Sequence, residues 1–228
     1  MRRLILPAFL ALLSAGAHAA DLKPMSASYA VLRDGKPVGD ATYSLTANND
    51  GTWTLRSQTR GTSGMARLAG LDVREESTFS WRNDSALGLR YDYQQDATFK
   101  HSKQTIDFDR GAKQAHVRDS KGNYDYAVPE SAMDRASLYL VLGHAAATGN
   151  RDLTLAVAGR DHVEQQHFVA HGEETIQVPA GSFKAVAFER VDMQGKARSW
   201  YSPTSLLPLR IEKTQGDGST IVLELKQH

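Results

Sequence analysis

Four side chains between positions 162 and 171 have the chemistry of metal ligands. His162, Glu164, His167 and His171 place three imidazoles and one carboxylate within ten residues, and both groups bind zinc. In a continuous strand, His162 and Glu164 would point to one face while His167 and His171 would point to the other. A metal site would therefore need a bulge, or His144 approaching from elsewhere. The alternation favours solvated histidines on a polar strand edge, so we predict no metal site and keep these four residues as weak candidates.

Other polar groups with catalytic potential lie where strand or turn geometry explains them. Asp107 and Asp109 share a strand face and could bind calcium or act as an acid and a base, but they flank a turn, where aspartate is common. Glu75 and Glu76 are adjacent in a strand, so they point to opposite faces. Ser63 lies near glycines without the spacing of a nucleophile elbow. The sequence also lacks phosphate-binding and dinucleotide-binding motifs, so we predict no catalytic residues and no cofactor.

Large aromatic residues are the candidates for an apolar ligand site. Phe79 and Trp81 share one face of a predicted strand, and Tyr91 and Tyr93 share one face of the next. The candidate set is Trp53, Phe79, Trp81, Tyr91, Tyr93 and Trp200. If these residues line the concave side of a curved sheet, they form an apolar cavity. If a helix packs on that side, they form the core instead, and both interpretations stay open.

The elements that must position these residues are mostly strands. From Met25 onward, alternating apolar and polar residues are interrupted by turn sequences such as 48–51 and 216–218. Short strands separated at about 8–12 residues by Gly, Asn and Asp indicate an antiparallel sheet built from hairpins. The predicted strands after the first, which contains Tyr29 and Val31, are 41–47, 53–57, 73–81, 87–95, 103–108, 114–118, 153–157, 163–169, 175–178, 183–191, 197–201, 209–213 and 220–225.

One segment has a helical period instead. Its apolar residues with helical spacing are Met133, Ala136, Leu140, Val141 and Ala145. This spacing predicts a helix over 133–148, with Ser131 as a candidate N-cap and Gly149 at its end. Residues 61–70 have room for one further helical turn. The predicted fold is mainly β: a single domain over 20–228 in which a curved antiparallel sheet, or open half-barrel, packs on one main helix.

The first nineteen residues have the pattern of a cleavable export signal. Arg2 and Arg3 precede an apolar run over 4–15, and Ala17-His18-Ala19 is a small-x-small cleavage sequence. The run is shorter than the roughly 20 residues that span a bilayer. We therefore predict cleavage after Ala19 and a soluble periplasmic protein without a transmembrane segment in its mature chain.

Composition excludes several classes of function. The 228-residue chain has 27 basic and 26 acidic residues, and loss of the leader with its two arginines makes the net charge slightly negative. Without a strong positive field we expect no nucleic-acid partner. The chain has no cysteine, which excludes disulfide scaffolds, thiol catalysis, thiolate zinc sites, iron–sulfur clusters and lipid attachment through cysteine. A chain of this length can fold by core packing alone.

Three stretches resemble a family of exported bacterial proteins catalogued as DUF3108. They are Tyr29 with Gly35-Lys36-Pro37-Val38-Gly39, the run 174–186, and Trp200-Tyr201-Ser202-Pro203 followed by 207–212. Together they cover nearly all of the predicted mature chain in the same order. The resemblance implies an exported β-rich protein and supplies no activity. The shape it implies is similar to that of LolA/LolB-like periplasmic carriers, in which a half-barrel and helix shield lipid or lipoprotein acyl chains.

These observations leave three classes of function. The first is a periplasmic, non-enzymatic protein that binds or shields an apolar or envelope-derived ligand. The second is a cell-envelope hydrolase or lyase that uses Asp, Glu and His side chains, and the third is a structural or interaction module with exposed strand edges. Titratable side chains that converge in a cleft would favour an enzyme, whereas an apolar cavity would favour a carrier. The sequence identifies neither the ligand nor the oligomeric state.

Overall fold

The computed structural model describes residues 22–228, so the predicted leader and its cleavage position lie outside the described residues. Strands β1 to β14 form one sheet in the order β8-β7-β6-β5-β4-β3-β2-β1-β14-β13-β12-β11-β10-β9. The strands are β1 Met25–Arg33, β2 Lys36–Ala47, β3 Trp53–Gly61, β4 Asp72–Arg82, β5 Ser85–Ala97, β6 Lys100–Asp109, β7 Gln114–Asp119, β8 Gly122–Ala127, β9 Asp152–Ala158, β10 Val163–Val178, β11 Gly181–Arg190, β12 Ala197–Tyr201, β13 Arg210–Thr214 and β14 Thr220–Gln227. The described residues also form two helices, α1 Gly64–Leu68 and α2 Leu138–Thr148.

Hairpin chemistry explains most of this order. Neighbouring strands pair antiparallel throughout the sheet. Most consecutive strands are joined by short turns, whereas α1 lies between β3 and β4 and a longer loop joins β12 to β13. Asp34 and Gly35 in one turn, and Asn83 and Asp84 in another, have the positive φ angles that tight hairpins require. The prediction of a mainly β fold with an antiparallel, open sheet is confirmed.

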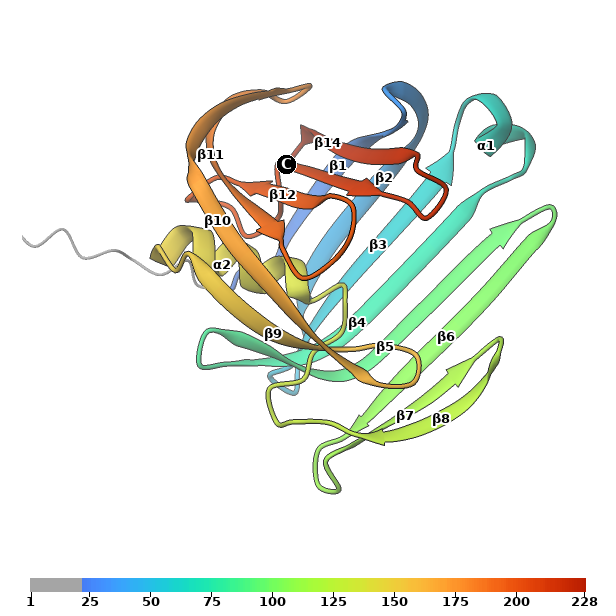
Figure 1. The fold of residues 1–228 in the computed structure, drawn as a ribbon, viewed down its shortest axis with the longest axis vertical. Helices are drawn as coiled ribbons and strands as arrows, with labels where there is room; N and C mark the ends of the chain where they lie inside the picture. Colours follow the sequence, from blue (N-terminus) through green and yellow to red (C-terminus); the bar gives the residue numbers. More distant parts are fainter. Residues whose placement is uncertain (1–21) are drawn as a thin grey trace, which may run out of the picture.

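The sheet curls without closing. Because β1 pairs with β14, the two groups of hairpins join in the middle of the sheet, and β8 and β9 are its free edges. Figure 1 shows β9 to β14 curving over the inner face of the longer strands, with α2 lying between the two parts. Residues that alternate inward along β1, Ala27, Tyr29 and Val31, are buried. The curled sheet thus has one inner face that carries the core and one outer face.

The free edges approach each other at one place, which we call the seam. The Tyr126 hydroxyl on β8 donates a hydrogen bond of 2.7 Å to the carbonyl of Gly159, which follows β9. Arg160 forms a 3.2 Å ion pair with the largely buried Asp119 carboxylate at the end of β7. Burial raises the pKa of Tyr126 to about 12, so this phenol stays a donor at neutral pH. Side chains therefore connect the two edges where backbone pairing does not.

Helix α2 begins later than the sequence predicts, at Leu138 instead of position 133. The backbone of Met133 is used by a bridge to β9: its N–H donates to Ala156 and its carbonyl accepts from Ala158. A residue held in that bridge cannot start a helix. At the other end, Gly149 has a φ of 81° and ends α2 as predicted.

Asp134, and not Ser131, satisfies the free N–H groups ahead of α2. Its fully buried carboxylate accepts hydrogen bonds of 2.9 Å from the N–H groups of Ala136 and Ser137, and one of 2.6 Å from the Ser77 hydroxyl. Burial raises the pKa of Asp134, although these hydrogen bonds oppose the shift. The carboxylate thereby fixes the start of α2 to β4.

The core lies where α2 packs on the inner face. Trp81 on β4 makes an edge-to-face contact with His144 of α2 at 5.6 Å between ring centroids. Gly143 lets the helix approach the chain at Leu206, because a Cβ there would lie 2.2 Å from the Leu206 carbonyl oxygen. Fully buried side chains at this end include Tyr29, Leu55, Phe79, Tyr91, Leu140, Leu142, Phe188 and Tyr201. This packing fills only part of the barrel interior.

Candidate binding cavity

The unfilled part of the interior is a cavity of about 1050 Å³, which we call the interior cavity. Its apolar lining includes Val31, Val73, Leu138, Ile211, Ile221 and Leu223. Its charged lining includes Glu75, Arg135, Glu164, Arg190 and Lys213. The cavity is within the size range of small-molecule sites, in which apolar walls carry a few placed polar groups. Strand alternation creates it, because β1, β4, β13 and β14 all turn inward-facing residues toward the same space.

An ion pair between Glu75 of β4 and Arg135, just before α2, lies beside the packed core. The nitrogen–oxygen distance is 2.8 Å, and the Tyr91 hydroxyl also donates to Glu75 at 2.5 Å. The guanidinium carbon of Arg135 lies 4.4 Å from the centre of the Tyr93 ring, a cation–π distance. Burial disfavours the charge of Arg135, but Glu75 and the hydrogen bond between them outweigh it, so its pKa is raised. The cation is therefore fixed and neutralised.

The phenols around this pair remain protonated. Burial raises the pKa of Tyr139 to about 12 and that of Tyr43 and Tyr91 well above the usual value, and the nearby Glu75 carboxylate adds to each shift. Tyrosinate is therefore not available as a base or nucleophile near neutral pH. These side chains supply hydrogen-bond donors and flat apolar surface.

Lys213 of β13 is one of three lysines that line the cavity, with Lys100 and Lys121. Within residues 22–228 it has no carboxylate oxygen inside the 4.0 Å ion-pair distance, whereas Arg190 pairs with Glu164 at 3.1 Å and with Asp192 at 2.9 Å. Although its side chain is exposed, desolvation lowers the pKa of Lys213, the positive charges of Arg135 and Arg190 lower it further, and the carboxylates of Glu164 and Glu75 oppose the shift. An anion placed beside this ammonium would relieve both effects. Lys213, which is opposite Ile221 in the sheet, thus places positive charge without a carboxylate partner next to the apolar wall.

The histidine-rich segment does not form a cluster. Ring nitrogens of His162, His167 and His171 lie 2.7, 2.8 and 3.0 Å from oxygens of three separate carboxylates, those of Asp161, Asp152 and Glu189 respectively. Glu164 pairs with Arg190 instead. Within the part of the chain that the structure describes, no three His, Asp or Glu side chains come together as metal ligands would.

The aromatic candidates separate into different environments. Tyr93 lines the interior cavity and Tyr91 lies beside it through Glu75. Phe79 is fully buried, and Trp53 and Trp81 are partly buried against the same core. Their contacts with the core account for these rings without a ligand.

Trp200 lies on the opposite side of the sheet from the cavity. Its neighbour Tyr201 is fully buried, alternation along β12 places Trp200 on the other face, and Trp200 is also buried, at 7% exposure. Arg198 and Arg210 flank the ring at 5.6 and 5.3 Å from its centroid, and Nε1 donates to Glu174 at 2.7 Å. This outer arrangement is a packed cation–π cluster.

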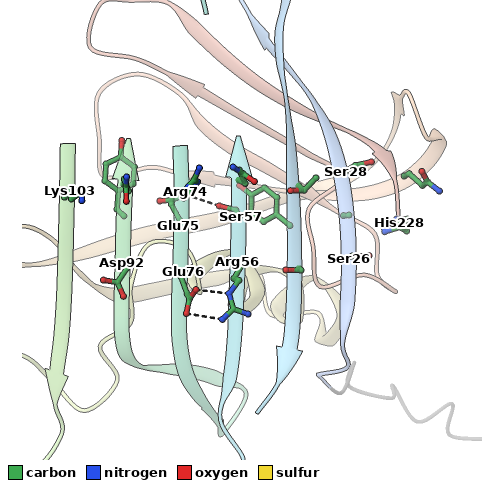
Figure 2. Close-up of a pocket in the computed structure, with 18 of the residues that line it drawn as sticks. Ser26, Ser28, Arg56, Ser57, Arg74, Glu75, Glu76, Asp92, Lys103 and His228 are labelled. Carbon is green, nitrogen blue, oxygen red and sulfur yellow. Dashed lines mark hydrogen bonds and ion pairs between the residues drawn. The ribbon is translucent and has the colours of Figure 1, made fainter. Parts of the chain in front are cut away.

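A second hollow, the outer groove, crosses the outer face of β1 to β6 and has a volume of about 930 Å³. Figure 2 shows Arg56 and Glu76 bonded across neighbouring strands there, and Ser26 and Ser28 on the strand at its side. Arg56 and Glu76 form a two-point contact with distances of 2.8 and 3.2 Å. Because its main charges neutralise each other, the outer groove offers a ligand less than the interior cavity does.

The remaining polar candidates have structural partners. Asp107 pairs with Arg90, and the Asp109 carboxylate accepts the N–H of Ala112 at 2.8 Å. The Ser63 hydroxyl donates to the carbonyl of Pro37. Sequence reasoning missed Arg135 and Lys213, because neither lies in a motif. For Lys213 the sequence did contain one signal: it lies two residues from Ile211 in one short strand, so both side chains share a face.

The structure thus defines a class: an open, barrel-like antiparallel β protein with a helix at one end of its interior and a charged cavity at the other. The family model described as "Protein of unknown function (DUF3108)" matches residues 25–226, and the chain belongs to this family. No curated protein sequence matches the chain.

Two solved structures match this chain over most of its length. One is the crystal structure of a beta-barrel-like protein of the domain of unknown function DUF1849 from Brucella abortus, with 12% identity and a TM-score of 0.57 over 91% of this chain and 97% of that one. The other is a protein with a YmcC-like fold from Bacteroides fragilis, with 9% identity and a TM-score of 0.30 over 89% of this chain and 93% of that one. The first supports the barrel-like fold. Within residues 22–228, neither helix has the length and apolar character needed to cross a bilayer.

Proposed function

We propose that this protein is a non-enzymatic binding protein whose interior cavity holds an amphipathic ligand with an anionic group. The observation that carries the proposal is Lys213, an unpaired cation beside apolar walls that include Ile211, Ile221 and Leu223. An apolar ligand portion gains by leaving water, and an anion at Lys213 gains a charge-assisted hydrogen bond. A purely apolar ligand would leave the Lys213 ammonium without an anionic partner.

The proposed setting is the periplasm. The export signal at 1–19, cleavage after Ala19 and a single mature domain over 20–228 are parts of this proposal. The likeness to LolA/LolB-like carriers supports it by fold-level analogy only. Mass measurement of the protein recovered from a periplasmic fraction tests the setting, because loss of residues 1–19 gives a defined mass. A precursor of full mass in the cytoplasm would contradict it.

The hydrolase or lyase alternative has one observation in its favour: Glu75, Arg135 and Tyr91 converge beside the cavity. Both Glu75 oxygens, however, already accept hydrogen bonds, one from Tyr91 and Arg135 and the other from Ser57 at 3.5 Å. A general base needs a lone pair directed at the substrate, and at the Oε1 oxygen Tyr91 and Arg135 occupy both. The arrangement therefore supports binding better than catalysis.

Binding of an anionic fluorescent dye tests the cavity directly. We expect 8-anilinonaphthalene-1-sulfonate, which joins an aromatic body to a sulfonate, to gain fluorescence with the native protein. Lys213→Met keeps the length and apolar character of the side chain but removes the charge. The substitution should weaken dye binding about tenfold, since hydrogen bonds to charged groups are worth roughly 1.5–3 kcal/mol.

Lys184→Met is the matched control, because Lys184 is exposed on β11 and does not line the cavity. Equal dye affinity in the native protein and the Lys213→Met variant would contradict the proposal. Native mass spectrometry of protein recovered from cells should also show a bound species with an acidic group. Repeated recovery without any bound species, together with no dye fluorescence, would reject a binding function.

A further inference from the structure

Three apolar side chains protrude from one end of the molecule, and we call them the apolar tip. Met65 and Leu68 of α1 are 77% and 78% exposed, and Phe99 in the β5–β6 turn is 97% exposed. The two loops lie together, because both the N–H and the hydroxyl of Thr98 donate to the carbonyl of Ala69, at 2.8 and 3.0 Å. Figure 1 shows α1 and the β5–β6 turn at the same end of the sheet.

The base of the apolar tip is firmly attached to the sheet. The N–H of Gly61 donates to Leu71 at 2.8 Å, and the N–H of Thr62 donates to Val38 at 3.0 Å. A Cβ on Gly61 would lie 2.4 Å from the carbonyl oxygen of Ala66, so the loop closes tightly on β3. None of the five residues of α1 is buried. The short helix therefore contributes nothing to the core and presents its apolar residues to the outside.

The surroundings of the apolar tip are basic. Segments 60–74 and 94–103 contain five Arg and Lys residues against two Asp residues, although the whole chain is nearly neutral. Both carboxylates are already bound: Asp72 by Arg74 at 2.9 Å, and Asp96 by His101 at 3.0 Å. The Arg67 side chain, between Met65 and Leu68, is exposed and has no carboxylate within 4.0 Å among residues 22–228. The tip thus combines protruding apolar groups with excess positive charge.

We propose that the apolar tip docks the protein on a bilayer that contains anionic lipids. Apolar side chains on surface-bound segments enter the boundary between headgroups and acyl chains, while Lys and Arg meet anionic headgroups. A stable protein partner usually covers about 800 Å² per side, and two narrow protruding loops do not provide such a flat surface. The proposal does not depend on the ligand proposed above. Leu71 and Lys100 line the interior cavity, so docking places the rim of that cavity at the lipid surface.

Co-sedimentation with vesicles tests the proposal. The full mature chain should bind vesicles of phosphatidylcholine with about 30% phosphatidylglycerol, and bind pure phosphatidylcholine at least fivefold more weakly. The triple variant Met65→Ser, Leu68→Ser, Phe99→Ser should lose at least about thirtyfold in affinity for the mixed vesicles. Val191→Ser removes an exposed apolar residue at 50% exposure elsewhere and should change the affinity less than twofold.

A charge reversal separates the electrostatic contribution. Arg67→Glu should weaken binding to mixed vesicles about tenfold and leave the weak binding to pure phosphatidylcholine unchanged, whereas Lys184→Glu should have under a twofold effect. Unfolding midpoints should match the native protein, because all these side chains are exposed. Absence of binding to mixed vesicles, or equal binding by the triple variant, overturns the proposal. Sedimentation equilibrium that shows a dimer lost in the triple variant overturns it in favour of self-association.

Discussion

Charged side chains inside this protein differ mainly in whether a neighbour neutralises them. A guanidinium nitrogen of Arg135 lies 2.8 Å from a carboxylate oxygen of Glu75, and this ion pair raises the pKa of Arg135 although burial alone would lower it. Lys213 faces the same cavity without such a partner, and desolvation lowers its pKa. Two cations in one cavity thus have opposite shifts: Glu75 raises the pKa of Arg135, whereas the positive charges of Arg135 and Arg190 add to desolvation at Lys213. Lys213 therefore keeps free capacity for an anionic ligand.

Asp192 gives a prediction about pH. Hydrogen bonding to Arg190 is the main cause that lowers its pKa from 3.8 to about 2, and the N–H of His167 contributes. A carboxylate with a lowered pKa stabilises the folded state above pH 4, and this contribution disappears as the pH falls toward 2. Because Asp192 is partly exposed, we expect Asp192→Asn to cost only about 1 kcal/mol at pH 6.

Urea unfolding at a series of pH values measures this effect. The difference between native protein and Asp192→Asn should shrink from its value at pH 6 to nearly zero at pH 2. Asp217→Asn is a control in a distant exposed turn, with a pKa lowered mainly by Ser219. A stability difference that stays constant from pH 6 to pH 2 would show that Asp192 acts through something other than its charge.

At the scale of elements, α2 depends on one close approach. Gly143 lies against the backbone of Leu206, where an added Cβ would meet the carbonyl oxygen at 2.2 Å. Gly143→Ala must push α2 away from the inner face, since the obstacle is backbone that cannot rotate aside. We expect a loss of about 2–3 kcal/mol in the free energy of unfolding, measured by denaturant titration.

Gly172→Ala is the matched control for Gly143→Ala. Gly172 lies in β10 with no atom within 4 Å of an added Cβ and no positive φ, so its replacement should change stability by less than about 1 kcal/mol. Equal effects of the two substitutions would show that α2 adjusts without cost. The sequence shows a glycine at 143 but not the chain that it approaches.

The local pattern of apolar and polar residues predicted most of the strands and the helix. It failed where contacts between distant parts of the chain determine where an element begins or ends. Predicted strands 163–169 and 175–178 are one strand, β10, with a register shift between Ala170 and Glu173 where the pattern breaks. Strand β8 was not predicted, because it is short and follows a turn sequence, although Tyr124 and Tyr126 alternate along it and pack against the core. The start of α2 was predicted too early, since the bridge of Met133 to β9 is invisible in sequence.

At the scale of the whole molecule, the seam joins the two free edges of the sheet through side chains. Tyr126→Phe removes the 2.7 Å hydrogen bond to Gly159 while the ring keeps its packing. We expect faster deuterium uptake in β7 and β8, by about fivefold, because local opening of this edge becomes about 1 kcal/mol easier. Hydrogen exchange followed by mass spectrometry resolves these peptides.

Tyr124→Phe is the control on the same strand, because no hydrogen bond of the Tyr124 hydroxyl to another side chain or to the backbone is present in the described residues. Strands β1 to β4 should exchange as before in both variants. Unchanged uptake in β7 and β8 of Tyr126→Phe would mean that the bridge of Met133 and the Arg160–Asp119 pair hold the edges alone.

The candidate site was less predictable than the fold. Tyr93 was identified as an aromatic on an inward face, and Glu75 was considered only beside Glu76. The partners that give Glu75 its environment, Tyr91 and Arg135, come from β5 and from the segment before α2. Whether Glu75, Tyr91 and Arg135 meet depends on how strongly the sheet curls. Alternation along a single strand does not determine that curvature.

The pairing of β1 with β14 places the first and last strands side by side, with Tyr29 opposite Leu225. The free edges of the sheet are therefore made from the middle of the chain. A circularly permuted chain that begins at α2, joins the present ends by a short linker and finishes at β8 would keep every pairing. In that chain each strand would pair only with its immediate neighbours in sequence, which lowers the contact order and speeds folding. The natural order instead delays completion of the sheet until the last strand has been made.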